Sequence, residues 1–64
     1  MYEILGFPVT FYSCSDVIDC LSSLTPETRH LFECSWIAYK GRPLFMILVE
    51  PDGKRFGLKL IPFR

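Results

Sequence analysis

The sequence lacks an excess of charge of either sign, since seven basic and seven acidic residues give a formal net charge of zero. General binders of nucleic acid or of anionic membranes carry a surplus of Lys and Arg, so this balance disfavours both classes. Apolar runs are short: the longest extends from Leu44 to Val49, far less than a bilayer span requires. The N-terminus has neither the basic region nor the long apolar core of a secretory signal. We therefore expect a cytoplasmic protein without a membrane segment.

Residue types that carry chemistry are scarce. There is one histidine, His30, and the three cysteines do not have the spacing of a zinc site. His30 and Cys34 stand four residues apart, close enough on a helix to share a metal or to act as base and nucleophile, but this spacing is common by chance. The glycines lack the spacing of phosphate-binding loops. We expect no catalytic residue, cofactor or metal, and an odd cysteine count favours free thiols in a reducing compartment.

Apolar residues, in contrast, are abundant: half of the chain is hydrophobic and 16% is aromatic. Such a composition excludes a disordered chain. A domain of about 60 residues buries only about 60% of the surface that its unfolded chain exposes, so it cannot easily hide this many apolar side chains. Some of them are expected at an interface, which predicts a homo-oligomer or a subunit of a complex. No repeat or linker divides the sequence, and residues 1–64 are read as a single domain.

The hydrophobic pattern changes period along the chain. Residues 2–12 alternate as in a strand, and residues 16–23 repeat at helical spacing. A second short helix is predicted to begin at Pro26 with Thr25 as its N-cap, packing Leu31 and Phe32. From Cys34 onward the pattern is that of three strands separated by two turns. The predicted fold is therefore a small two-layer α+β domain: an antiparallel sheet, made of an N-terminal strand and a C-terminal three-stranded meander, covered on one face by two short helices.

The turn at Pro51-Asp52-Gly53 predicts how the last two strands pair. Read as a three-residue hairpin loop, it places Glu50 opposite Lys54. One side of the hairpin is then wholly apolar and is expected to face the helices. Its predicted pairs are Leu48 with Phe56, Met46 with Leu58 and Leu44 with Leu60.

The other side of this hairpin mixes large apolar residues with bases. If Gly41-Arg42 is a two-residue loop, Trp36 joins this side, whereas a slip of one residue replaces Trp36 with Ile37 and Tyr39. Aromatic residues and Arg are enriched at binding hot spots, and an apolar patch on an open sheet face is rarely kept without use. The predicted partner-binding residues are Trp36, Phe45, Ile47, Val49, Arg55 and Lys59.

These features favour binding over catalysis. The sequence predicts a small non-enzymatic protein-interaction module, an inhibitor or regulator that binds a larger protein or self-associates as a homodimer through the apolar and basic sheet face. Two alternatives stay open, a single-stranded nucleic-acid binder that stacks bases on its aromatic rings and a small structural subunit of a larger complex. The pattern resembles the general run of very small α+β chains, many of which are viral or mobile-element proteins that block a site on a larger protein.

Overall fold

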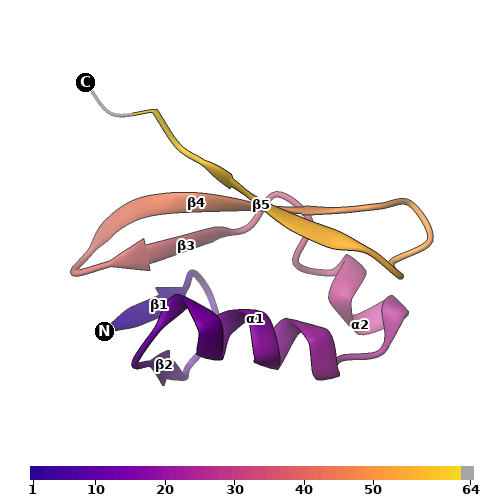
Figure 1. Ribbon diagram of the computed structural model, residues 1–64, viewed down its shortest axis with the longest axis horizontal. Coiled ribbons are helices and arrows are strands. Elements are labelled where there is room, and N and C mark those ends of the chain that lie inside the picture. Colours follow the sequence, from indigo (N-terminus) through magenta and orange to yellow (C-terminus); the bar gives the residue numbers. More distant parts are fainter. Residues whose placement is uncertain (63–64) are drawn as a thin grey trace.

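In the computed structural model, which describes residues 1–62, the chain forms a five-stranded antiparallel sheet with two short helices against it. The strand order across the sheet is β2-β1-β3-β4-β5 (Figure 1). This arrangement confirms the predicted α+β class. In chain order the elements are β1 (Tyr2–Ile4), β2 (Thr10–Phe11), α1 (Cys14–Ser23), α2 (Pro26–His30), β3 (Trp36–Tyr39), β4 (Arg42–Val49) and β5 (Phe56–Leu60).

The N-terminal segment is a hairpin, whereas the sequence predicted one strand. The chain reverses at Gly6, whose φ of +82° lies in the region that glycine adopts without strain. The N–H of Phe7 donates to the carbonyl of Ile4 at 3.0 Å and closes the turn. β2 then returns beside β1, and Pro8, which has no N–H to donate to a ladder, lies in the loop between them.

Side-chain caps begin both helices. The Oγ of Ser13 accepts a hydrogen bond from the N–H of Asp16 at 3.1 Å, so α1 starts two residues earlier than predicted. Thr25 caps α2 as predicted, with Pro26 in its first turn. The predicted packing of Leu31 was wrong, because α2 ends at His30 and leaves Leu31 80% exposed. Phe32 packs against the core.

The hairpin between β3 and β4 turns through Lys40 and Gly41. Both residues have positive φ, 51° and 77°, which is the conformation of a tight two-residue hairpin turn. Tyr39 therefore pairs with Arg42, so the predicted Gly41-Arg42 loop was wrong by one residue.

The hairpin between β4 and β5 has a longer loop than predicted. The N–H of Glu50 donates to the carbonyl of Arg55 at 2.9 Å, so the loop contains four residues, 51–54. Inside it the N–H of Gly53 donates to the carbonyl of Glu50 at 2.8 Å. The register is therefore shifted by one residue from the prediction, and Ile47 pairs with Leu58. A shift of one residue moves every side chain of a strand to the opposite face of the sheet.

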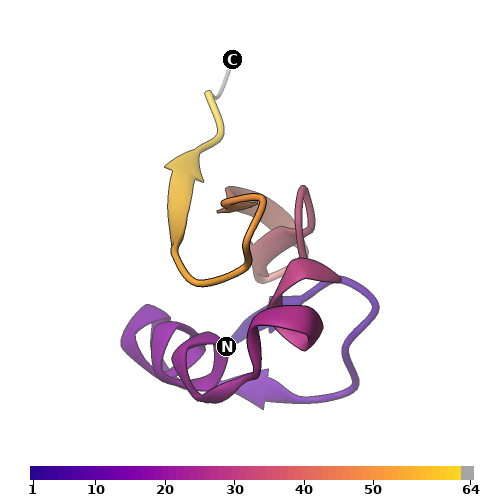
Figure 2. The ribbon, with the colours of Figure 1, turned by 90° about the vertical axis from the view of Figure 1, so that its right-hand side faces the viewer.

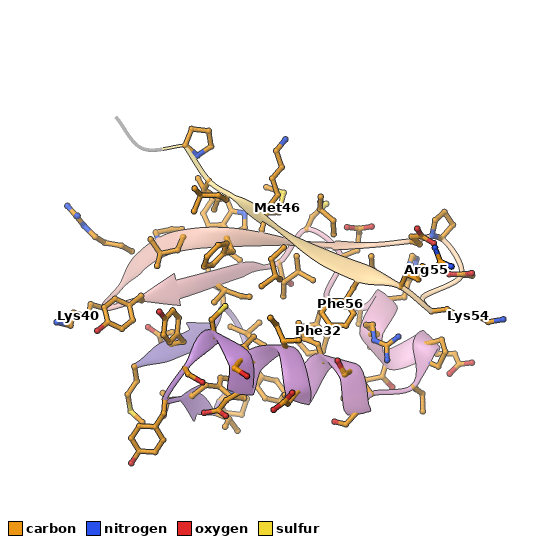
Figure 3. The ribbon with its side chains drawn as sticks, in the orientation of Figure 1. Phe32, Lys40, Met46, Lys54, Arg55 and Phe56 are labelled. Atoms are coloured by element: carbon orange, nitrogen blue, oxygen red, sulfur yellow. The ribbon has the colours of Figure 1, made fainter. Side chains whose placement is uncertain are left out.

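The core consequently contains the residues that the prediction placed outside. Ile47 is fully buried and Val49 is 5% exposed, packed with Ile37 of β3 and with Val17 and Leu21 of α1. Figure 3 shows Phe32 and Phe56 between the sheet and the helices, while Met46 extends from the opposite side of the sheet. The expectation that Leu44, Met46 and Leu48 face the helices was wrong, because the loop after Glu50 is one residue longer than assumed.

One buried cation ties the helices to this hairpin. Arg29 of α2 is 7% exposed, and its guanidinium donates only to backbone carbonyl oxygens. Its partners at the end of α1 are Leu21, Ser22 and Leu24, at 2.8, 3.1 and 2.8 Å, and those in the β4–β5 turn are Gly53 and Lys54, at 2.7 and 3.2 Å. The same guanidinium lies over the ring of Phe56, 5.4 Å from its centroid. This contact fixes the turn against the helical layer.

Gly53 allows the β4–β5 turn to lie close to the start of α2. Its φ is +72°, and a Cβ at this position would overlap the carbonyl oxygen of Pro26. Any side chain at this position would force the turn away from the start of α2. From the sequence, Arg29 is only one of seven basic residues, because neither composition nor periodicity distinguishes a buried arginine from an exposed one.

Candidate functional site

The side of the sheet that faces away from the helices, here called the outer face, carries several exposed apolar side chains. Its central row contains one residue each from β3, β4 and β5, together with Leu5, which directly follows β1. The N–H of Leu5 donates to the carbonyl of Trp36 at 3.0 Å, Trp36 pairs with Met46, and Met46 pairs with Lys59. Side chains that pair directly across antiparallel strands lie on the same face, so these four residues are neighbours there.

Two further rows extend the outer face on either side. Leu48 pairs with Gly57 towards the β4–β5 turn. In the other direction, the N–H of Ile61 donates to the carbonyl of Leu44 at 2.8 Å. Trp36, Leu48 and Leu5 are 41%, 42% and 51% exposed, so three large apolar side chains on this face are open to solvent.

Charge lies at the margins of the outer face rather than at its centre. Lys59 stands at the β5 end of the central row and is exposed. Arg55 directly precedes β5 and lies opposite Glu50. Both residues are exposed. The face therefore has an apolar centre with a lysine at one margin.

The structure separates the six predicted partner-binding residues into two groups. Trp36, Arg55 and Lys59 are exposed. Ile47 and Val49 belong to the core, and Phe45 is partly buried against it, so the predicted grouping on one accessible face was wrong. The alternative register, in which Ile37 and Tyr39 replace Trp36 beside these three, is the observed one.

Sequence reasoning missed Leu5, Met46 and Leu48 as members of the outer face. The first was assigned to a continuous strand, and the other two to the helical side by the assumed loop length. A signal was present at Lys40-Gly41, because a glycine as the second residue of a two-residue hairpin loop is typical of a turn with positive φ. That reading would have corrected the loop but not the pairing of Trp36, because a β-bulge between Ile37 and Ala38 shifts the β3–β4 register by one further residue.

A shallow concavity of about 310 Å³ lies between the start of α2 and the β4–β5 turn. It is lined by Pro26, Glu27, His30, Pro51 and Asp52. The histidine and the two carboxylates come from exposed segments, and within residues 1–62 no group of three or more His, Cys, Asp or Glu side chains is arranged to hold a metal ion. This concavity is an open surface depression beside the turn.

Further observations bear on the class of protein. Cys14, Cys20 and Cys34 are free thiols. Neither helix in the described part of the chain has the length and apolar character needed to cross a membrane. In comparisons with known proteins, no family model, curated protein or solved structure matched the chain. The geometry of the outer face is therefore the main guide to function.

Proposed function

We propose that this chain is a small protein-interaction module that binds a larger protein through the outer face, and that it regulates or inhibits that protein by covering part of its surface. The observation that carries the proposal is the row of Leu5, Trp36 and Met46 on a sheet face that no helix covers. Exposed contiguous apolar surface of this kind marks interaction sites in soluble proteins. A cytoplasmic location, with its reducing conditions, suits the three free thiols.

The composition of the outer face favours a protein over a nucleic acid. Single-stranded nucleic acids bind to several aromatic rings together with a basic groove that follows the backbone. The central row has one ring, Trp36, and one base, Lys59, among aliphatic side chains. Tryptophan in an apolar patch with a basic margin is typical of a protein-binding hot spot.

Site-specific photocrosslinking in the cells that make the protein tests this proposal. A photoreactive benzoylphenylalanine replaces Met46 on the outer face, and the matched control replaces Ile18, which is 40% exposed on α1. The proposal expects a protease-sensitive, nuclease-resistant adduct with a larger protein from position 46, lost when Trp36→Glu is added, and little adduct from position 18. Nuclease-sensitive adducts, or equal adducts from both positions, contradict it.

A further inference from the structure

β5 is an open edge of the sheet, distinct from the outer face. Within residues 1–62 it pairs with β4 and with no other strand. Figure 2 shows it as the margin of the sheet, with the rest of the strands to one side. The opposite edge, β2, has two residues, whereas β5 has five. β5 is therefore the longer template for a further strand.

The hydrogen-bond pattern shows which backbone groups of β5 are unused by β4. At the two ends of the pairing, the carbonyl of Arg55 accepts from the N–H of Glu50 at 2.9 Å, and the N–H of Ile61 donates to the carbonyl of Leu44 at 2.8 Å. In an antiparallel ladder such pairs alternate, so Gly57 and Lys59 also direct their backbone groups towards β4. The N–H and carbonyl groups of Phe56, Leu58 and Leu60 consequently point to the open edge.

The side chains of β5 add two features to this edge. Leu60 is 65% exposed although it lies on the same side of the strand as Phe56 and Leu58, which pack against the core. Gly57 has no atom within 4 Å of the place where a Cβ would stand. The edge thus combines a solvent-exposed leucine, Leu60, with Gly57, which carries no side chain and lies two residues before Lys59.

We propose that β5 pairs in antiparallel fashion with β5 of a second copy of the chain, about a two-fold axis at Leu58. In this register each residue with free backbone groups faces another: Leu58 faces its counterpart, and Phe56 faces Leu60 of the other copy. The exposed Leu60 then packs beside an aromatic ring. The two sheets join into one continuous sheet, as in other symmetric dimers with an isologous interface.

The charges of β5 permit pairing with a second copy without a directly opposed like-charged pair. Lysine on an edge strand normally discourages pairing, because a partner strand places a group against it. In the proposed register Lys59 faces Gly57 of the other copy, where no side chain stands, so two lysines are not directly opposed. The directly opposed pairs therefore contain no like charges, while Arg55 and Lys59 of the other copy lie diagonally to each Lys59. Since the outer face is left free, this inference goes beyond the proposed function and is tested separately from it.

Charge placed at Gly57 provides the first test, by analytical ultracentrifugation of the purified full chain. The mass of the unsubstituted protein should rise from 7.4 kDa towards twice that value with concentration. Gly57→Lys sets two like-charged pairs across the interface and should raise the dissociation constant about tenfold or more. Gly57→Glu, matched in position and similar in size, should lower it, because each glutamate faces Lys59. Shifts in the same direction for both variants overturn the proposal.

Proline at the open edge provides the second test. Leu60→Pro removes an N–H that points away from β4 and should leave a folded monomer, since proline is tolerated on edge strands at such positions. Leu60→Ala keeps the N–H and should weaken association less. Circular dichroism confirms that each variant is folded. The amide of Leu58 should exchange more slowly with solvent as the protein concentration rises, whereas concentration-independent exchange contradicts pairing.

The remaining outcomes separate this inference from the proposed function. A monomer at every concentration up to about 1 mM overturns the β5 pairing and leaves the outer face available for a larger protein. A dimer that Trp36→Glu dissociates and Leu60→Pro does not also overturns it, and assigns self-association to the outer face. A dimer with the reverse sensitivities supports the β5 pairing.

Discussion

Both faces of strand β4 are apolar, but only one of them is buried. On β4, the inner residues Ile47 and Val49 are at most 5% exposed, whereas the outer residue Leu48 between them is 42% exposed. Apolar character does not distinguish these neighbours. The difference comes from the turns, which fix the register, and from the helices, which cover one side. When a strand is apolar on both faces, its loops and the layer that covers one side determine which face is buried, and its second face stays exposed.

The largest expected difference between the two faces is the loss of stability when a lysine replaces each of two adjacent residues of β4. Ile47→Lys places a lysine at a fully buried position and should cost about 4 kcal/mol or more, enough to unfold a marginally stable domain at every concentration. Met46→Lys, one residue away on the outer face, should change the free energy of unfolding by about 1 kcal/mol or less. Thermal melts followed by circular dichroism measure both. A folded, soluble Ile47→Lys with a stability similar to that of Met46→Lys would reverse the assignment of the faces.

The second prediction concerns the contact that holds the helical layer on the inner face. Arg29→Met preserves most of the side-chain volume but removes the donors to five carbonyl groups, and should cost about 3 kcal/mol. Arg55→Met, an exposed arginine, should change stability by about 0.5 kcal/mol or less. Urea unfolding compares the two variants. Equal stabilities would mean that the buried guanidinium does not anchor the layers.

The third and smallest expected effect tests the turn that sets the register. Gly53→Val adds a branched side chain at positive φ and against the backbone of Pro26, and should cost about 2 kcal/mol. Gly57→Val, which meets open space on the outer face, is the control and should leave stability nearly unchanged or raise it. Thermal unfolding of both variants measures the difference. An unaffected Gly53→Val would show that the loop conformation is wrong.

Much of the fold was predictable because local signals determine it. Thr25-Pro26 marks the start of α2, and the change from helical to strand period near Cys34 marks the start of the meander. The register was not predictable to the residue, because Pro51-Asp52-Gly53 fits a loop of three or of four residues equally well. Both faces of β4 are apolar, so the usual check by alternation was missing.

The candidate site was predicted only as far as the register allowed. Trp36 and Lys59 were identified as exposed members of an apolar and basic surface, and they are exposed. Their predicted neighbours Ile47 and Val49 were wrong, because one error in loop length exchanges whole sets of residues between faces. Arg29 could not be identified from sequence, since its partners are backbone atoms distant along the chain.

The anchor formed by Arg29 has a consequence for how freely this sequence can vary. Its acceptors are main-chain oxygens, which every amino acid carries, so the exposed side chains of Ser22 and Lys54 can be exchanged without removing a partner. The contact requires an arginine at position 29 and a glycine at position 53, where the β4–β5 turn lies against the start of α2. A selection experiment for folded variants should therefore accept many residues at these two exposed acceptor positions while retaining Arg29 and Gly53. The contact between the helical layer and the sheet is thus specified by two residues and tolerates substitution of exposed residues around them.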